Sequence, residues 1–141
     1  MSDRRSIRSG SQWEERGGYC RAVVVGRRVF VAGTAPSMPG DADPPPDAYG
    51  QTRRCFEIVE EALREAGGGL EHVVRTRMLL AEASVAEEVL RAHHDLFADV
   101  RPVNTSCVVG LLDPRWHVEI EVDAVLPRDP RAPAPSPGSA R

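Results

Sequence analysis

The sequence predicts an α+β fold in which a single β-sheet carries two helices on one face. β-branched runs with alternating polarity mark five strands, and two stretches with apolar residues every three or four positions mark helices. These elements follow in the order β-β-α-β-α-β-β, without an internal repeat. Because two helices cover only one face of a sheet, the opposite face stays partly apolar and uncovered. Such a face favours self-association, so we expect a homo-oligomer with clefts at the subunit junctions.

Length and charge limit the possible functions. With 141 residues, of which 41% are hydrophobic and 28% are charged, the chain fits one globular domain. Its formal net charge of −3 gives no reason to expect a nucleic-acid or anionic-membrane partner. All 18 strongly basic residues are arginines, so the protein has no lysine amine for a Schiff base. Mechanisms that need one, including those of pyridoxal phosphate, are therefore excluded.

Cysteines and histidines do not predict a disulfide or a metal site. Cys20, Cys55 and Cys107 are odd in number and far apart, and no CxxC spacing occurs. His93 and His94 are consecutive, so on a helix their side chains diverge by about 100°. We therefore expect neither a metal nor a cofactor. The N-terminus has no apolar signal sequence and no apolar run could span a bilayer, which predicts a soluble cytoplasmic protein without a membrane partner.

The chain divides into three segments. Residues 1–16, rich in Ser, Gly and Arg, predict a flexible N-terminal arm, although Trp13 would gain from docking onto the domain. Residues 17–126 form the predicted domain. Residues 127–141 are rich in Pro, Arg and Ala, and hold too little apolar surface to offset the entropy of ordering. We expect this tail to be disordered.

Each element of the domain has a local cause. Gly26 and Arg27 join two β-branched runs as a hairpin turn, and five prolines between residues 36 and 46 define a long loop. Residues 48–66 show helical periodicity that stops at Gly67, and residues 73–80 alternate as a strand. Ser84 and Glu87 have the spacing of a capping box. They are expected to start the second helix, which ends before residues 101–102.

The last two strands carry the candidate chemistry. Between residues 117 and 125 the apolar residues share one face, and the other face carries His117, Glu119, Glu121 and Asp123. Glu119 lies on a rigid strand, which is the placement that a general acid or base needs. A solvated strand carboxylate is the alternative interpretation. Cys107, on the preceding strand near the expected cleft, is either a packed thiol or a nucleophile.

Several short motifs follow one another along the domain. They are Gly18-Tyr19-Cys20-Arg21-Ala22, Val29-Phe30-Val31-Ala32-Gly33, the Gln51 helix ending in Glu65-Ala66-Gly67, Val73-Val74-Arg75-Thr76, His94 to Phe97, Arg101-Pro102 and Val118-Glu119-Ile120-Glu121. In this combination the chain resembles the Rid (YjgF) family over residues 17–126. The resemblance implies a chorismate-mutase-like homotrimer with clefts between its subunits.

The resemblance also implies an activity. Family members of the deaminase branch hydrolyse reactive 2-imino or enamino acids to 2-keto acids and ammonia, and an arginine clamps the substrate carboxylate. Asn104 occupies that position here, and an amide lacks the charge and the bidentate fork of a guanidinium. Glu119 matches the family glutamate that positions or deprotonates the attacking water. The residues expected to bind the substrate are Asn104, Cys107, Tyr19, Ala32 and Gly33.

Three hypotheses follow. The first is a Rid-like enzyme that hydrolyses or tautomerises a small imine or enamine other than a standard 2-imino acid. The second is a regulatory trimer that binds a metabolite in the same clefts without turnover. The third, endoribonuclease activity, is disfavoured because the chain is acidic and lacks interleaved basic and aromatic residues.

Overall fold

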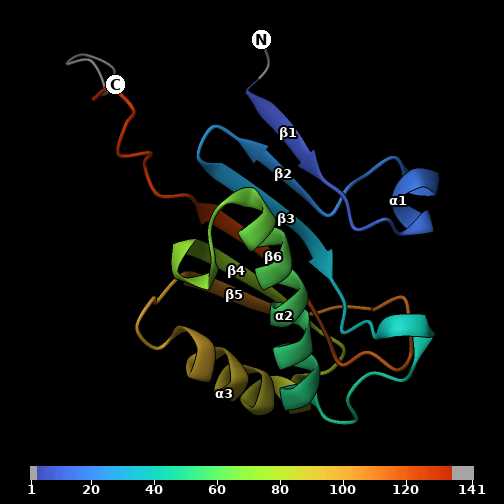
Figure 1. Cartoon of the computed structure of the whole chain (residues 1–141). Coiled ribbons are helices and arrows are strands. Elements are labelled where there is room, and N and C mark those ends of the chain that lie inside the picture. Colours follow the sequence, from blue (N-terminus) through green and yellow to red (C-terminus); the bar gives the residue numbers. More distant parts are fainter. Residues whose placement is uncertain (1–2, 135–141) are drawn as a thin grey trace.

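The computed structural model describes residues 3–134, which form a six-stranded sheet with helices packed on one side (Figure 1). The strands lie in the spatial order β1-β2-β3-β6-β4-β5, and all neighbours are antiparallel except β4 and β5. The elements in chain order are β1 (Arg4–Ile7), α1 (Gln12–Gly17), β2 (Ala22–Val25), β3 (Arg28–Thr34), η1 (Pro39–Asp41), α2 (Ala48–Ala66), η2 (Leu70–His72), β4 (Val73–Leu80), η3 (Ala83–Val85), α3 (Ala86–Phe97), β5 (Val103–Val108) and β6 (Val118–Val125).

The predicted α+β fold is confirmed. From β2 to β6 the strands and α-helices follow the order β-β-α-β-α-β-β, and α2 and α3 pack together on one face of the sheet (Figure 1). The core lies between these two layers, where Phe56, Leu63 and Phe97 of the helices form one cluster with Met78 and Ile120 of the sheet. Burying each such side chain contributes about 1.5–3 kcal/mol. None of the helices within residues 3–134 is long and apolar enough to cross a lipid bilayer.

The longest helix, α2, begins and ends where the sequence places its caps. The carboxylate of Asp47 accepts a hydrogen bond from the N–H of Gly50 at 2.6 Å. Gly67 follows the helix with a φ of 104°, a left-handed conformation that glycine adopts without strain. The predicted helix over residues 48–66 is thus confirmed at both ends. The predicted hairpin between β2 and β3 is confirmed as well, with Gly26 in its turn.

The central strand is β6, because it pairs with β3 on one side and β4 on the other. Its helix-facing residues are all buried, with exposed fractions of 2% or less: Val118, Ile120, Val122 and Ala124. Glu119, Glu121 and Asp123 alternate with them and therefore point to the opposite, open face. The carboxylate row expected from the sequence is thus held in place by the packing of the core.

The expectation of a flexible arm over residues 1–16 is wrong for the part that the structure describes. Residues 4–7 form β1, an edge strand that pairs with β2, and Ile7 is buried in the core. The guanidinium of Arg5 donates a hydrogen bond to the carbonyl oxygen of Ala66, at the end of α2, at 2.6 Å. Residues 12–17 form α1. One buried isoleucine in a polar segment gives no periodic signal, so pattern reasoning missed this strand.

Three other expectations concern the start of α3, the C-terminal tail and Trp13. The capping box is wrong, because the hydroxyl of Ser84 donates to the carboxylate of Glu82 and a 3-10 turn leads directly into α3. Residues 127–134 are exposed and hold no helix or strand, and residues 135–141 of the predicted disordered tail lie outside the described residues. Trp13 is 56% exposed, with the guanidinium of Arg16 lying 4.8 Å from its ring centroid.

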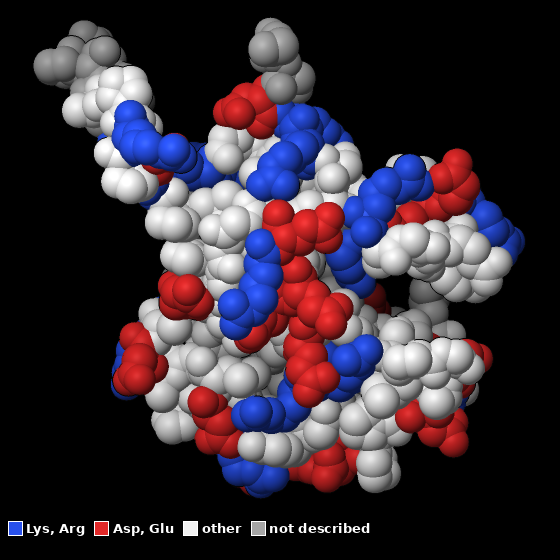
Figure 2. Space-filling model, viewed as in Figure 1, with Lys and Arg blue, Asp and Glu red and all other residues white. Residues whose placement is uncertain are grey.

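The two faces of the molecule differ in their surfaces. On the helix side, acidic and basic side chains intermingle over α2, including the ion pairs Arg54–Glu57 and Arg64–Glu60 (Figure 2). Within residues 3–134 no helix covers the opposite face of the sheet. Ion pairs between β4 and β6 lie there at 3.4–3.6 Å, and Phe30 is 45% exposed. All six residues of the edge strand β5 are exposed as well.

His93 of α3 is half-buried at the boundary between the helices and the sheet. Its ring centroid lies 4.8 Å from that of Phe97 and 6.0 Å from that of Phe56, and its Nε2 lies 2.9 Å from the hydroxyl oxygen of Thr76. Burial lowers the pKa of His93 below its ordinary value. The folded protein therefore takes up this proton less readily than the unfolded chain does.

We expect His93 to make the fold sensitive to acid. Its stabilising contribution is complete above the unfolded pKa of about 6.5, and it is lost as the pH falls below that value through the folded pKa. Urea unfolding at about pH 7.5 and about pH 5 measures this loss of free energy. The loss should shrink in His93→Gln and persist in His94→Gln, whose side chain is 75% exposed in the wild type. An equal pH dependence in wild type and His93→Gln would contradict the assignment.

Candidate functional site

Glu119, the predicted catalytic residue, is fixed on the open face of the sheet by β6. Its neighbours Val118 and Ile120 are fully buried on the other side, so the strand cannot turn without removing both from the core. Burial raises the pKa of the Glu119 carboxyl above its ordinary value, while the positive charge of Arg21 opposes the shift and Glu121 adds to it. A carboxyl with a raised pKa exchanges protons nearer to neutral pH, as a general acid or base does.

Gly33 faces Glu119 across the pairing of β3 with β6. The register of the two strands shifts between Val31 and Thr34, so β3 is irregular at the residues between them, Ala32 and Gly33. A β-carbon built on Gly33 would lie 2.7 Å from Glu119 Oε1, closer than real side chains approach. Glycine at this position therefore leaves the space that the carboxylate of Glu119 occupies.

Arg21 lies beside this pair, although the sequence analysis did not assign it to the site. Its Nη2 donates hydrogen bonds to the carbonyl oxygens of Ala32 at 2.9 Å and Gly33 at 2.8 Å. Its Nε is buried and has no hydrogen-bond partner among the described residues. Burial lowers the pKa of Arg21, and the charges of Glu14 and Glu119 are among those that oppose this shift. Because an arginine pKa starts far above neutral pH, the guanidinium stays charged.

The segment predicted as an arm contributes to this group of residues. Glu14 of α1 is buried and accepts hydrogen bonds from the N–H and the hydroxyl of Ser9. Burial alone would raise the pKa of Glu14, but these hydrogen bonds and the charge of Arg21 bring it below its ordinary value. The carbonyl of Glu14 accepts a hydrogen bond from the N–H of Tyr19, whose side chain is exposed. A lone glutamate in a polar segment is normally interpreted as solvated, so no pattern marked Glu14.

These residues form one group, which we call the Glu119 cluster. Its members are Glu119, Gly33, Ala32, Arg21, Glu14 and Tyr19. Four of them were predicted from the sequence, and Arg21 and Glu14 were not.

Gln51 of α2 restrains the loops that adjoin this cluster. Its side-chain amide donates to the carbonyl oxygens of Pro45 at 3.0 Å and Arg115 at 2.9 Å, and its oxygen accepts from the N–H of His117 at 2.7 Å. The side chain is buried, and these bonds pair its donors and its acceptor. His117 directly precedes β6, so Gln51 fixes the backbone two residues before Glu119.

Arg115 connects the same two loops through charge. Its guanidinium pairs with Asp113 on its own loop at 2.9 Å, and with Asp41 at 2.9 Å and Asp43 at 3.3 Å on the loop after β3. The hydrogen bonds from Arg115 hold the pKa of Asp113 below its ordinary value. The loop that follows Gly33 and the loop that precedes Glu119 are thus tied to each other.

The structure separates the two predicted binding residues of β5. Leu79 of β4 pairs with Glu119 on one side and with Cys107 on the other, so Cys107 lies on the open face, two strand spacings or about 10 Å from Glu119. Its thiol is exposed and not packed in the single chain. Asn104 pairs with Thr76, which is buried on the helix side, so Asn104 also points to the helix side, away from the face that carries Glu119. Within one chain Asn104 and Glu119 do not share a site.

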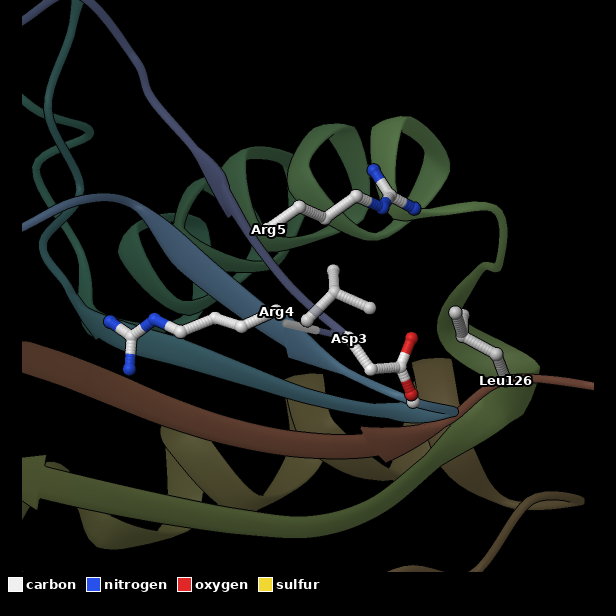
Figure 3. Close-up of a pocket in the computed structure, with 6 residues that line it drawn as sticks. Asp3, Arg4, Arg5 and Leu126 are labelled. Atoms are coloured by element: carbon white, nitrogen blue, oxygen red, sulfur yellow. The ribbon is translucent and has the colours of Figure 1, made fainter. Parts of the chain in front are cut away.

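Other parts of the described chain offer less chemistry. Within residues 3–134 no group of three His, Cys, Asp or Glu side chains could hold a metal ion. A hollow beside β1 is lined by Asp3, Arg4, Arg5, Val24, Gly26 and Leu126 (Figure 3). The side chains of Arg4 and Arg5 run in opposite directions there (Figure 3), so their guanidinium groups do not converge on one ligand. No residue of the Glu119 cluster lines this hollow.

The Glu119 cluster combines groups suited to acid–base chemistry on a small polar molecule. A carboxyl with a raised pKa transfers a proton or orients a water molecule, and an arginine with unpaired donors binds an anion or stabilises negative charge. Gly33 leaves the room that the carboxyl of Glu119 itself occupies. These are the kinds of groups that proton transfer requires.

Comparison with known proteins identifies the family. The family model described as "Endoribonuclease L-PSP" matches residues 10–126. The chain belongs to this family, the YjgF/Rid family. The resemblance inferred from the sequence motifs is thereby confirmed.

Individual relatives agree with this assignment. An uncharacterized protein of Streptomyces coelicolor is 46% identical over 125 residues, which cover 85% of this chain and 90% of the relative. The 2-iminobutanoate/2-iminopropanoate deaminase of Rattus norvegicus is 27% identical over 110 residues, with 77% and 80% covered. The crystal structure of a YjgF-family protein from Mycobacterium tuberculosis is 40% identical and superimposes with a TM-score of 0.79, covering 87% of this chain and 99% of the other. The YjgF/Rid fold and the presence of a named imine deaminase among the relatives are therefore established.

The substitution Gly33→Ala tests the contact between β3 and Glu119. The backbone at Gly33 is not left-handed, so alanine fits the strand, but its β-carbon would displace the carboxylate of Glu119. Because the displaced atom is the end of a flexible side chain, we expect a small loss, below about 1 kcal/mol, in the free energy of unfolding, together with a changed Glu119 titration in carbon-detected NMR. Gly110→Ala is the matched control, because a β-carbon there meets nothing within 4 Å. An unaltered Glu119 titration in Gly33→Ala would contradict the contact.

Proposed function

We propose that the protein is a Rid-like enzyme that hydrolyses or tautomerises a small imine or enamine, with Glu119 as its acid–base group. The observation that carries the proposal is the partly buried carboxyl of Glu119, which has a raised pKa and is held on β6 against Gly33. Hydrolysis of a C=NH group adds water to the carbon and one of its protons to the nitrogen; the second proton then moves from the new hydroxyl to the nitrogen, the C–N bond breaks, and a carbonyl compound and ammonia are released. One carboxyl group serves both steps, because in each it takes a proton from the oxygen that came from water and returns it to the nitrogen.

The similarity to a named deaminase supports this reaction class. The rat relative bears the name of an enzyme that acts on 2-iminobutanoate and 2-iminopropanoate. The substrate proposed here differs from a standard 2-imino acid, because Asn104 stands where the deaminase branch is expected to carry its arginine. Asn104 also lies on the sheet face opposite Glu119 in the single chain. The substrate is therefore anchored by another group.

We further propose a homotrimer whose clefts complete the site. The support is the apolar surface left exposed along β5 and the open face, where Val103 is 58% exposed, Val108 is 55% exposed and Phe30 is 45% exposed. Burying such surface between copies of the chain favours association. A neighbouring β5 at the Glu119 cluster would bring the neighbour's own Asn104 and Cys107 towards Glu119.

Ammonia release from 2-iminopropionate and from neutral imines tests the reaction. In Glu119→Gln we expect turnover to fall by about 10²–10⁴-fold, since the amide keeps the shape but exchanges no proton. Glu121→Gln, on the same face of the same strand, should keep most of the activity. In the wild type, a step that needs ionised Glu119 should slow as the pH falls through the raised pKa of this carboxyl. Unchanged turnover in Glu119→Gln would remove Glu119 from the mechanism.

The same measurements separate the enzyme from a regulatory protein. Calorimetric binding of metabolites to the wild type without any product would favour the metabolite-binding trimer over the enzyme. Strong, salt-dependent RNA binding by the purified protein would instead support the endoribonuclease hypothesis.

Light scattering of the purified protein tests the trimer. We expect a mass three times that of the chain, and a lower mass for Val103→Glu, which places a charge on the exposed edge strand. Glu61→Gln, on the outer surface of α2, is the control and should keep the wild-type mass. A monomeric wild type over a range of protein concentrations would contradict the proposal.

A further inference from the structure

We infer that Trp13 and Tyr19 form a binding site for a planar aromatic group, and that the imine or enamine substrate carries an aryl substituent. This inference rests on the proposed function. It names the groups that anchor the substrate, since Asn104 points away from Glu119 in the single chain. We call the two aromatic side chains, with the face of α1 between them, the aromatic platform.

Helix α1 is short, yet the structure fixes both of its ends. The hydroxyl of Ser11 accepts a hydrogen bond from the N–H of Trp13 at 3.2 Å, which caps the start of the helix. Gly18 ends the helix with a φ of 69°, in the left-handed region. Between them the buried carboxylate of Glu14 accepts hydrogen bonds from Ser9, so the inner side of α1 is held against the residues that follow β1. Trp13 therefore extends from a segment that is held in place.

Trp13 and Tyr19 lie on the same face of this helix. Residues four apart on a helix are neighbours on one face, so Trp13 and Gly17 share a face. The ring of Tyr19 lies against Gly17, because a β-carbon built there would be 2.6 Å from Tyr19 Cε1. Glycine at position 17 thus lets the phenol ring fold back onto the helix. The two rings therefore border one surface.

Both rings are open to a ligand. Trp13 is 56% exposed and Tyr19 is 52% exposed. The guanidinium of Arg16 lies 4.8 Å from the centroid of the Trp13 ring and covers part of the indole. Two flat rings favour a planar aromatic partner, because aromatic groups stack with their centroids about 4.5–7 Å apart. An aliphatic group would bury apolar surface there but would lack the stacking contact.

The charges around the platform favour a small molecule over a second copy of the chain. Glu15 and Arg16 are exposed on the same short helix, and the carboxylate of Glu15 pairs with Arg8 at 2.7 Å. The centre of a protein–protein interface is depleted of charged residues, because removing them from water is costly. A ligand the size of one ring stacks on the platform without burying these charges.

The aromatic platform adjoins the Glu119 cluster through Tyr19. The phenol of Tyr19 is close enough to Arg21 for its ionised form to oppose the lowering of that arginine's pKa. The guanidinium of Arg21 donates to the carbonyl oxygen of Gly33 at 2.8 Å, and Gly33 borders the carboxyl of Glu119. A substrate with its C=N group at Glu119 thus extends its substituent towards Tyr19, and beyond it towards Trp13.

Fluorescence titrations with benzamide and cyclohexanecarboxamide test the platform. Both probes are neutral amides of a six-membered ring, and only benzamide has a planar aromatic ring. The titrations use Trp116→Phe, which leaves Trp13 as the only tryptophan. We expect benzamide to change the emission of Trp13 and to bind at least about threefold more tightly than cyclohexanecarboxamide.

Three variants locate the preference for benzamide, which calorimetry measures where Trp13 is absent. Trp13→Leu should lose the preference, and Trp13→Phe should keep part of it because a smaller ring still stacks. Tyr49→Leu is the matched control, since it removes another aromatic ring that is stacked with an arginine. The guanidinium of Arg91 lies 4.7 Å from the centroid of the Tyr49 ring. This variant should keep the full preference.

Thermal unfolding shows whether each variant is folded. Where Trp13→Leu does not fold, the indole N–H resonance of Trp13 replaces it, and benzamide should shift this resonance more than cyclohexanecarboxamide does at equal concentration. Equal affinity for the two probes, binding of neither, or full preference in folded Trp13→Leu overturns the aromatic platform. A lower mass of Trp13→Leu than of the wild type in light scattering also overturns it, because a second copy of the chain then covers Trp13.

Ammonia release from the C=NH imines of acetophenone and cyclohexyl methyl ketone separates this inference from the proposed function. We expect Trp13→Leu to raise the KM for the aryl imine at least about threefold with kcat nearly unchanged. A benzamide preference that depends on Trp13, without ammonia release from any imine, overturns the proposed function and supports the platform. Ammonia release that depends on Glu119, with one KM for both imines and no change in Trp13→Leu, supports the proposed function and overturns the platform.

Discussion

The alternation of side chains along β6 is the constraint on which the other features of this protein depend. One face of the strand supplies Val118, Ile120 and Val122 to the core, and the other presents Glu119 on the open face. A shift of one residue in register would exchange the two faces and place carboxylates in the core. The packing that stabilises the sheet therefore also positions the candidate catalytic carboxyl.

Polar side chains hold the loops around the Gly33–Glu119 contact in place, in addition to the packing of the apolar core. Gln51 is buried on the helix side, where an unpaired amide would be costly, and its hydrogen bonds hold both loops next to the Gly33–Glu119 contact. Arg115 adds ion pairs between the same loops. These loops are thereby tied to α2, the longest helix of the fold, which favours a preorganised site.

The N-terminal segment links the fold to the electrostatics of the site. β1 extends the sheet and inserts Ile7 into the core, and α1 brings Glu14 close to Arg21. The guanidinium of Arg21 in turn donates a hydrogen bond to the carbonyl oxygen of Gly33, the residue that borders Glu119. An arginine from the residue preceding β2 thus lies next to Glu119, on the sheet face where the arginines of β4 pair with the other carboxylates of β6.

The sequence by itself determined the elements from β2 to β6 and the open-face position of Glu119. Helical periodicity, the glycine at 67 and a strand with one buried face are local signals, since each follows from neighbours within a few residues. Tertiary structure decided the rest. Asn104 lies on a strand with no buried face, so its orientation follows from pairing with β4. Arg21 and Glu14 become site residues only because β2, β3 and α1 meet in space, and no local pattern encodes a contact between distant segments.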